Sequence, residues 1–196
     1  MKKQILTLAF TLASAGLLRA DLMQPISIDT TSLNGQAGYL DLQFNPDGPT
    51  AAAAAASLLN VSTDAAGISN NFQSASVTGS FLSDTLAIGN SPISGSNPAN
   101  EDTENVTFGN DIAFTLDFSG PALTPGPGVV DGSTFSISLY DLNGNSLLAS
   151  TGPVEQVTLT PEGLLNTTIY TPEPAVFGLI GLGVAALVFA RRKRIA

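Results

Sequence analysis

Alternation of apolar and polar residues is the feature of this 196-residue chain that most limits its fold. It is clearest in Gly38–Asn45, Asp111–Phe118 and Ser133–Asp141, where apolar side chains occupy every second position. In an extended strand such residues share one face, whereas a helix distributes them around its axis. The pattern therefore predicts half-buried antiparallel strands with one face towards a core.

Shorter segments of similar character are separated by turn residues such as Asn34-Gly35 and Asn143-Gly144. We expect further strands at Pro25–Asp29, Asn71–Ser80, Phe81–Ile88, Ser146–Ser150, Glu155–Thr160 and Leu164–Tyr170. Gly89–Glu104 and Gly120–Gly132 are predicted to be loops, the first with a solvated acidic tip at Glu101–Glu104. About nine or ten short strands between the chain ends predict an all-β fold, a jelly-roll-like antiparallel β-sandwich, over residues 21–170.

The segment Thr50–Ala66 fits two structures. Its six alanines, Ala51 to Ala56, have high helix propensity. The following residues alternate in the manner of a strand, and this pattern favours a strand at Ser57–Thr63 with the alanines leading into it. A helix is the alternative.

The charges of the chain are segregated. All seven Lys and Arg residues lie near the two ends, and all sixteen Asp and Glu residues lie between Asp21 and Glu173. A nucleic-acid partner is excluded because the central region has no cation to neutralise phosphates. Salt bridges cannot form within that region, so we expect stability to rise as the pH falls towards about 4–5, unless the fold hydrogen-bonds the carboxylates.

Cysteine and histidine are absent. Disulfides and thiol chemistry are therefore excluded, and the usual zinc ligand and neutral-pH general base are missing. We assign no catalytic residue, no metal ligand and no cofactor from the sequence.

The C-terminus has a three-part pattern. Pro172-Glu173-Pro174 is followed by an uncharged apolar run over residues 175–190 and then by the basic residues Arg191, Arg192, Lys193 and Arg194. Sixteen helical residues at about 1.5 Å each approach the thickness of a bilayer core. The basic residues would stop the segment on the cytoplasmic side, so we expect a transmembrane helix at 175–190.

This pattern resembles the PEP-CTERM sorting signal of bacteria, which combines a Pro-Glu-Pro motif, a hydrophobic helix and an Arg-rich tail. The resemblance covers residues 171–196 and implies recognition by an exosortase, a membrane protease-transpeptidase that removes the tail. A plain membrane anchor is the alternative. A second resemblance, to a group of PEP-CTERM proteins, rests on Gly38–Pro46, Phe108–Ile112, Ser119–Pro121 and Ser138–Asp141; it implies one continuous β-rich ectodomain and adds no site.

The N-terminus has the form of a secretory signal peptide over residues 1–20. Lys2 and Lys3 precede a mostly apolar stretch, and cleavage is expected after Ala15 or after Ala20. Both ends of the chain therefore predict export: the protein would be held transiently in the inner membrane and then sorted to the cell surface or extracellular matrix.

Two tyrosines are candidate ligand-facing residues. Tyr39 and Tyr140 lie at outward positions of two predicted strands, where aromatic rings could stack against a sugar. Asp111 and Asp117, with Asp41 on another outward face, could in principle form a glycosidase carboxylate pair, although nothing in the sequence brings them together.

The spacing Asp141-x-Asn143-x-Asn145 resembles the start of a calcium loop, but Ser146 and Gly152 occupy the positions that need Gly and Glu. A simple hairpin turn is favoured there.

Taken together, these features predict a non-enzymatic, exported surface or matrix protein. The alternative is a carbohydrate- or calcium-dependent binding module, with extracellular polysaccharide as partner, and a glycosidase ranks third.

Overall fold

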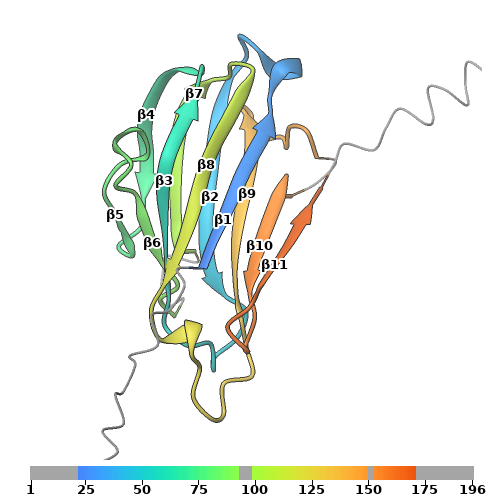
Figure 1. The fold of residues 1–196 in the computed structure, drawn as a ribbon. Coiled ribbons are helices and arrows are strands. Elements are labelled where there is room, and N and C mark those ends of the chain that lie inside the picture. Colours follow the sequence, from blue (N-terminus) through green and yellow to red (C-terminus); the bar gives the residue numbers. More distant parts are fainter. Residues whose placement is uncertain (1–21, 93–98, 150–151, 171–196) are drawn as a thin grey trace, which may run out of the picture.

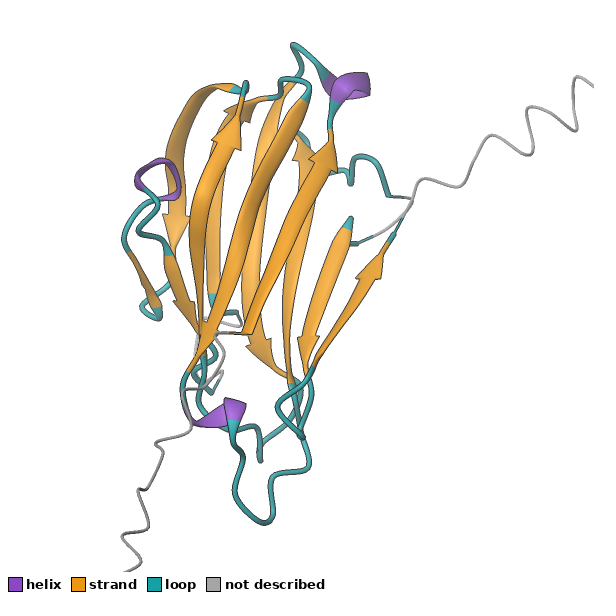
Figure 2. Ribbon diagram, in the orientation of Figure 1, coloured by secondary structure: helices purple, strands orange, loops and turns teal. Residues whose placement is uncertain are grey.

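The computed structural model describes residues 22–92, 99–149 and 152–170. These residues form two antiparallel β-sheets packed face to face (Figures 1 and 2), which confirms the predicted β-sandwich. The predicted signal peptide at 1–20, the sorting motif and the apolar segment at 175–190 lie outside them. Within the described ranges, no helix is long and apolar enough to cross a membrane.

Five strands form one sheet in the order β1-β8-β3-β6-β5. Their bounds are Leu22–Asp29, Asp111–Ser119, Ala55–Thr63, Ala87–Gly89 and Val77–Thr78, in that order. The other sheet has six strands in the order β11-β10-β9-β2-β7-β4. Their bounds are Leu165–Ile169, Glu155–Leu159, Ser133–Asp141, Ala37–Pro46, Glu101–Thr107 and Ala66–Gln73. Three short 3-10 helices, Thr31–Leu33, Phe81–Ser83 and Pro121–Leu123, lie in the connections.

The chain changes sheet at nearly every step. Successive strands alternate between the sheets from β1 to β5 and again from β6 to β9. This wrapping places strands distant in sequence side by side, for example β1 with β8 and β2 with β7 and β9. It is the connectivity expected of a jelly-roll-like sandwich.

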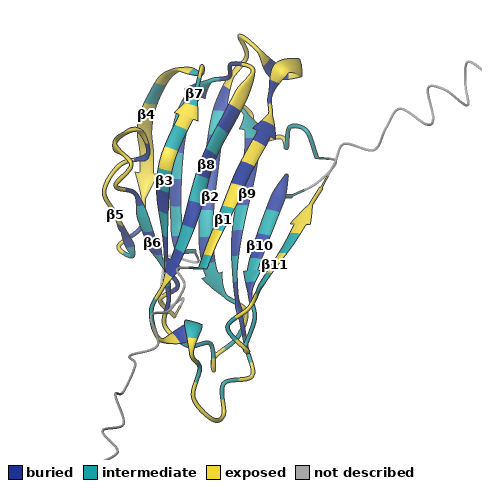
Figure 3. Ribbon diagram, viewed as in Figure 1, coloured by how far each residue is buried: buried dark blue, intermediate teal, exposed yellow. Residues whose placement is uncertain are grey.

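The core lies between the inner faces of the two sheets. Buried and more exposed residues alternate along β8 and β9 (Figure 3), as the sequence pattern predicted. The ring of Phe44 on β2 lies 5.6 Å from that of Phe118 and 6.2 Å from that of Phe135, measured between centroids. These contacts join the middle strands of both sheets through one aromatic cluster.

The segment Thr50–Ala66 contains a strand and not a helix, and most of the alanines lead into that strand, as predicted. β3 runs over Ala55–Thr63 and pairs with β8, with a register shift between Leu59 and Ser62. Ala56 and Leu58 are fully buried between the sheets. Of the alanines, only Ala54 and Ala56 are buried, and tertiary pairing overrides helix propensity here.

The prediction of strands at Asn71–Ser80 and Phe81–Ile88 was correct only in part, since the first range holds the end of β4 and the short β5, and the second holds only the start of β6. The first strand of this region, β4, begins earlier, and Phe81–Ser83 is a 3-10 helix. Phe81 is buried and packs edge-on against Phe114, with centroids 6.3 Å apart. The apolar side chain of Phe81 thus fixes a loop to the core and does not belong to a strand. Asp84, in a left-handed conformation, then ends the 3-10 helix.

The loop predicted at Gly89–Glu104 was wrong at its C-terminal end. Glu101–Thr107 is strand β7, and Asp102 and Glu104 lie on its inner face together with Val106. The predicted solvated acidic tip is therefore part of the sandwich. Acidic residues at inward positions concealed the alternation that would otherwise have revealed this strand.

The strand predicted at Ser146–Ser150 was also wrong within the described residues. Asn143-Gly144 forms the expected turn, with Gly144 at a φ of +81°. Beyond it, Ser146 makes only an isolated bridge with Tyr140, and Leu148 turns the chain away at a φ of +61°. The neighbouring edge of β9 is occupied by β10 instead.

Replacing Phe44 by alanine should lower the free energy of unfolding by about 3–5 kcal/mol, because a buried ring that contacts both sheets leaves a cavity. Chemical unfolding of the full-length chain, followed by circular dichroism, measures this loss. The matched control is Phe72→Ala on β4, whose side chain is 42% exposed and should cost much less. Equal losses for the two variants would contradict the assignment of Phe44 to the centre of the core.

Candidate binding groove on the outer face of the six-stranded sheet

The two candidate tyrosines lie next to each other. Tyr39 on β2 is directly paired with Tyr140 on β9, and both side chains point to the outer face of the six-stranded sheet and are partly exposed. Directly opposed residues of an antiparallel pair have Cβ atoms about 4.5–5.5 Å apart. The fold therefore brings together two aromatic rings separated by a hundred residues of sequence.

A groove of about 310 Å³ runs across this face, over strands β9, β2, β7 and β4. Its lining residues are Tyr39, Asp41, Asn71, Phe72, Glu101, Thr103, Tyr140 and Gly144. The volume lies at the lower end of the ~300–1,000 Å³ range of small-molecule sites. Aromatic rings at both sides and convergent polar groups between them are the composition expected of a ligand site.

Asp41 lies in the groove but is not the solvent-facing carboxylate that the sequence suggested. It shares a row across the sheet with Ser138 and Thr103, and only 5% of its surface is exposed. Larger side chains such as Tyr39 and Phe72 stand around it in the groove. The side chain of Asp41 points to the outer face of the sheet, as predicted. It is nevertheless shielded from water, because longer side chains on the same face cover this short one.

The carboxylate of Asp41 is held on one side only. Gln43 donates through Nε2 to its Oδ2 at 2.9 Å, and Asn45 donates in turn to Gln43. The other oxygen, Oδ1, is buried and lacks a hydrogen-bond partner. Burial, followed by the negative charge of Glu101, raises the pKa of Asp41 to about 7. Asp41 is therefore a carboxyl group poised near neutral pH and short of one hydrogen-bond donor.

Glu101 supplies the second carboxylate of the groove. It lies on β7, paired with Gln43, and accepts a hydrogen bond from the Thr103 hydroxyl at 3.0 Å. Unlike Asp41, it is partly exposed. The groove thus offers one accessible and one shielded carboxylate beside two tyrosine rings.

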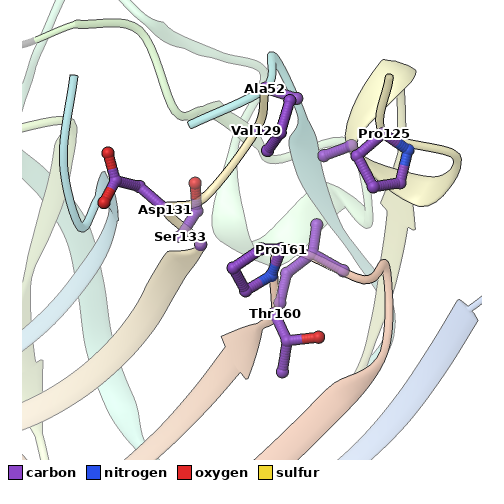
Figure 4. A pocket seen from close by; sticks show the side chains of 10 residues that line it. Ala52, Pro125, Val129, Asp131, Ser133, Thr160 and Pro161 are labelled. Carbon is purple, nitrogen blue, oxygen red and sulfur yellow. The ribbon is translucent and has the colours of Figure 1, made fainter. Parts of the chain in front are cut away.

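Another cavity is too small for a ligand. It lies between the loops at one end of the sandwich, lined by residues such as Pro125, Val129 and Pro161 (Figure 4), and encloses about 10 Å³. That is roughly the space of one water molecule. Asp131 at its rim is engaged elsewhere, since its carboxylate accepts bonds from the Thr50 amide and hydroxyl at 3.0 and 2.8 Å.

Two further carboxyl groups lie inside the sandwich. Asp102 and Glu104, on the inner face of β7, are 0% and 2% exposed. Asn70 donates to Asp102 Oδ1 at 3.2 Å, while Asp102 Oδ2 lacks a partner. Burial raises the pKa of both groups, that of Glu104 to about 7. Glu155 on β10 is also buried, and burial raises its pKa.

The calcium-like sequence forms a hairpin turn. The Asp141 carboxylate accepts bonds from the Asn143 amide at 2.8 Å, and from the Asn145 amide and side chain at 2.9 and 2.8 Å. These bonds lower the pKa of Asp141. Its oxygens are thus used to close the turn. Within the described ranges, no three Asp or Glu side chains gather closely enough to hold a metal ion.

The carboxylate pair considered for glycoside hydrolysis is not assembled. Asp111 and Asp117 lie six residues apart on β8, which is about 20 Å along a strand. Glycosidase pairs are about 5–9.5 Å apart. Asp41 belongs to the other sheet and faces outward from the opposite side of the sandwich.

Sequence reasoning identified Tyr39 and Tyr140 but missed Phe72, Glu101 and Thr103. The sequence pattern predicts a loop for the last two and, for Phe72, a strand position without a site. Only the pairing of β2 with β7, and of β7 with β4, places them beside the tyrosines. Recognising Glu101–Thr107 as a strand would have placed Glu101 and Thr103 on the same face of the sheet as the tyrosines.

The buried carboxyls predict that the fold is more stable in mild acid than at alkaline pH. Raised pKa values in the folded state mean that the stabilisation from Asp41 and Glu104 is present at low pH and is lost as the pH rises through about 7. Asp64, in a loop, and Asp141, at the end of β9, have lowered pKa values, so the stabilisation that they contribute is lost as the pH falls below about 4. We expect Tm at pH 5 to exceed Tm at pH 8 by at least about 5 °C.

Thermal unfolding of the full-length chain by circular dichroism tests this expectation. The double variant Asp102→Asn, Glu104→Gln keeps the shape of both side chains and should raise Tm at pH 8 and flatten the pH dependence. Asp111→Asn, an exposed change on β8, should leave the slope intact. A wild-type Tm that is constant or rises from pH 5 to pH 8 would contradict the burial of these groups.

Comparison with known proteins identifies the C-terminal segment. The family model of the PEP-CTERM protein-sorting motif matches residues 171–194, a span that includes Pro172-Glu173-Pro174 and the basic residues Arg191 to Arg194. No curated protein and no solved structure matches the chain. The chain therefore carries a PEP-CTERM sorting motif behind its β-sandwich, which implies export, processing by an exosortase and a cell-surface or extracellular fate.

Proposed function

We propose that this protein is a non-enzymatic component of the cell surface or extracellular matrix. In this proposal a signal peptide at 1–20 exports it, the segment 175–190 holds it transiently in the inner membrane, and an exosortase releases it. The observation that carries the proposal is the sorting motif itself. The described β-sandwich reaches the residue before this motif, since the amide of Tyr170 donates to the carbonyl of Val154 at 2.8 Å.

A non-enzymatic role is supported by the placement of the carboxyl groups. Asp41 has the raised pKa of a general acid, but its Oδ2 is bound by Gln43 and its Oδ1 is shielded. A general acid must come within hydrogen-bond reach of its substrate. The groove therefore has the features of a binding surface more than those of a hydrolytic site.

The groove favours carbohydrate binding as the activity of the sandwich. Paired tyrosine rings form a platform for the apolar face of a sugar, and the carboxylate and hydroxyl groups beside them accept bonds from sugar hydroxyls. Calcium-dependent binding has less support, because an oxygen of the Asp141 carboxylate already accepts hydrogen bonds from backbone amides of the turn. We therefore propose an extracellular polysaccharide as the partner.

Replacing Pro172, Glu173 and Pro174 by alanine should abolish C-terminal processing in the native cells. Mass spectrometry of the mature protein should find a terminus near Pro172 to Pro174 in the wild type and an intact Arg191–Ala196 tail in the variant. The matched control is Pro161→Ala with Glu162→Ala, a Pro-Glu pair in a loop of the sandwich. An intact tail in the wild type would contradict sorting and indicate a plain membrane anchor.

Tyr39→Ala and Tyr140→Ala should each weaken polysaccharide binding by about tenfold or more, because each removes half of the stacking platform. Glycan-array binding of the full-length chain in a sugar-free polyoxyethylene detergent measures this. Tyr170→Ala is the matched control, since Tyr170 is not among the residues that line the groove and directly follows β11, the edge strand farthest from β4 in the same sheet. Loss of binding in all three variants, or in none, would contradict the groove as the site.

A further inference from the structure

The charge of the groove narrows the class of sugar that it can bind. This inference rests on the proposed carbohydrate function. The charged side chains that line the groove, Asp41 and Glu101, are both acidic. Burial of Asp41 and then the negative charge of Glu101 raise the pKa of Asp41, and Asp102 on the inner face of β7 contributes in the same direction. All Lys and Arg residues of the sequence lie outside the described residues.

Acidic saccharides are disfavoured by this arrangement. A uronic acid or a sulfated sugar would place a third negative charge beside two carboxylates without a cation to compensate it. Like charges brought together at a binding surface weaken binding and exclude such partners. The ligand must instead donate hydrogen bonds or carry positive charge, because a carboxylate only accepts.

The shielded oxygen of Asp41 distinguishes a cationic ligand from a neutral one. Oδ1 is buried without a partner, so a neutral sugar that donates only at the surface does not reach it. The field of a positive charge acts over several ångströms and is screened little where water is absent. A cation in the groove would therefore favour the ionised form of Asp41 without touching it.

The aromatic residues of the groove also favour a cationic ligand over a neutral one. A cation within about 6 Å of a tyrosine ring is attracted by the negative face of the ring. Tyr39 and Tyr140 supply two such rings, and Glu101 supplies an accessible acceptor in the same groove. A sugar that stacks on the rings can thus direct an attached ammonium group towards the carboxylates.

We propose that the groove binds the cationic amino-sugar residues of a polysaccharide, with the sugar rings on Tyr39 and Tyr140 and the ammonium group beside Glu101 and above Asp41. The volume of about 310 Å³ suits a short saccharide segment and not an extended protein surface. A bare metal ion is disfavoured, since within the described ranges no cluster of three acidic side chains is found.

Binding of four tetrasaccharides to the full-length chain, in a sugar-free polyoxyethylene detergent at low salt, tests the proposal. The probes are the β-1,4-linked glucosamine tetramer, its N-acetylated form, the neutral glucose tetramer and the galacturonate tetramer. We expect the glucosamine tetramer to bind about tenfold more tightly than its N-acetylated form, as expected for one charge-assisted hydrogen bond, and the galacturonate tetramer not to bind. Spermidine, a cation without a sugar ring, should bind much more weakly.

Near-isosteric variants separate the groove from general attraction to an acidic protein. Asp41→Asn and Glu101→Gln keep their hydrogen-bond acceptors but lose the charge, and each should remove most of the preference for the glucosamine tetramer. Asp111→Asn removes one charge from the outer face of the other sheet and should leave the preference unchanged. With a trimethylated glucosamine tetramer, whose charge does not titrate, binding should strengthen from pH 6 to pH 8 in the wild type but not in Asp41→Asn.

The outcomes distinguish this inference from the proposed function. Equal binding of the acetylated and free tetramers, or tighter binding of the neutral one, would overturn the amino-sugar preference and leave carbohydrate binding intact. Failure of all saccharides to bind would overturn both. Spermidine binding as tight as that of the glucosamine tetramer, or an equal loss in Asp111→Asn, would show attraction by charge alone and would also overturn the inference.

Discussion

The absence of cationic side chains from the sandwich is the constraint on which its structure depends. Of the sixteen acidic residues in the sequence, only Asp21 and Glu173 lie outside the described residues, whereas all Lys and Arg residues do. Ion pairs cannot hold this fold together. Each carboxyl group must instead be hydrated, bound by neutral donors, or protonated.

Binding by neutral donors and protonation occur in different parts of the molecule. In the loops, carboxylates such as Asp64 and Asp131 accept bonds from backbone amides of distant segments, at 2.6 Å from Asn110 and 3.0 Å from Thr50. These bonds hold the loops against the strand ends and lower the pKa values of Asp64 and Asp131. Within the sheets, Asp41, Asp102 and Glu104 are buried and have raised pKa values. The two groups respond oppositely to acid, so the charge pattern sets the pH range in which the fold is most stable.

Sequence reasoning succeeded where burial follows the alternation of side chains. β2, β8 and β9 were placed correctly because their inward positions carry Leu, Ile and Phe, and the same rule identified Tyr39 and Tyr140 as outward residues. It failed at β7, whose inward positions Asp102 and Glu104 are acidic, and at Phe81, whose apolar ring anchors a loop. The groove could not be predicted as a whole, since it depends on which strands become neighbours. That choice is made by long-range pairing and not by local pattern.

The position of β11 has a mechanical consequence. β11 is the edge strand of the six-stranded sheet, and its C-terminal end pairs with the start of β10 through Ile169 and Glu155. The sorting motif begins immediately after Tyr170, so a pull on the C-terminal end of the chain reaches the fold there first. A force that draws this end away from the sheet would first open the hydrogen bond from Tyr170 to Val154 and then those of β11 one after another, beginning at the Ile169 pair. Under such a force the sandwich would thus lose a single short strand first, while the central strands β2 and β9 and the groove they carry would bear load only afterwards.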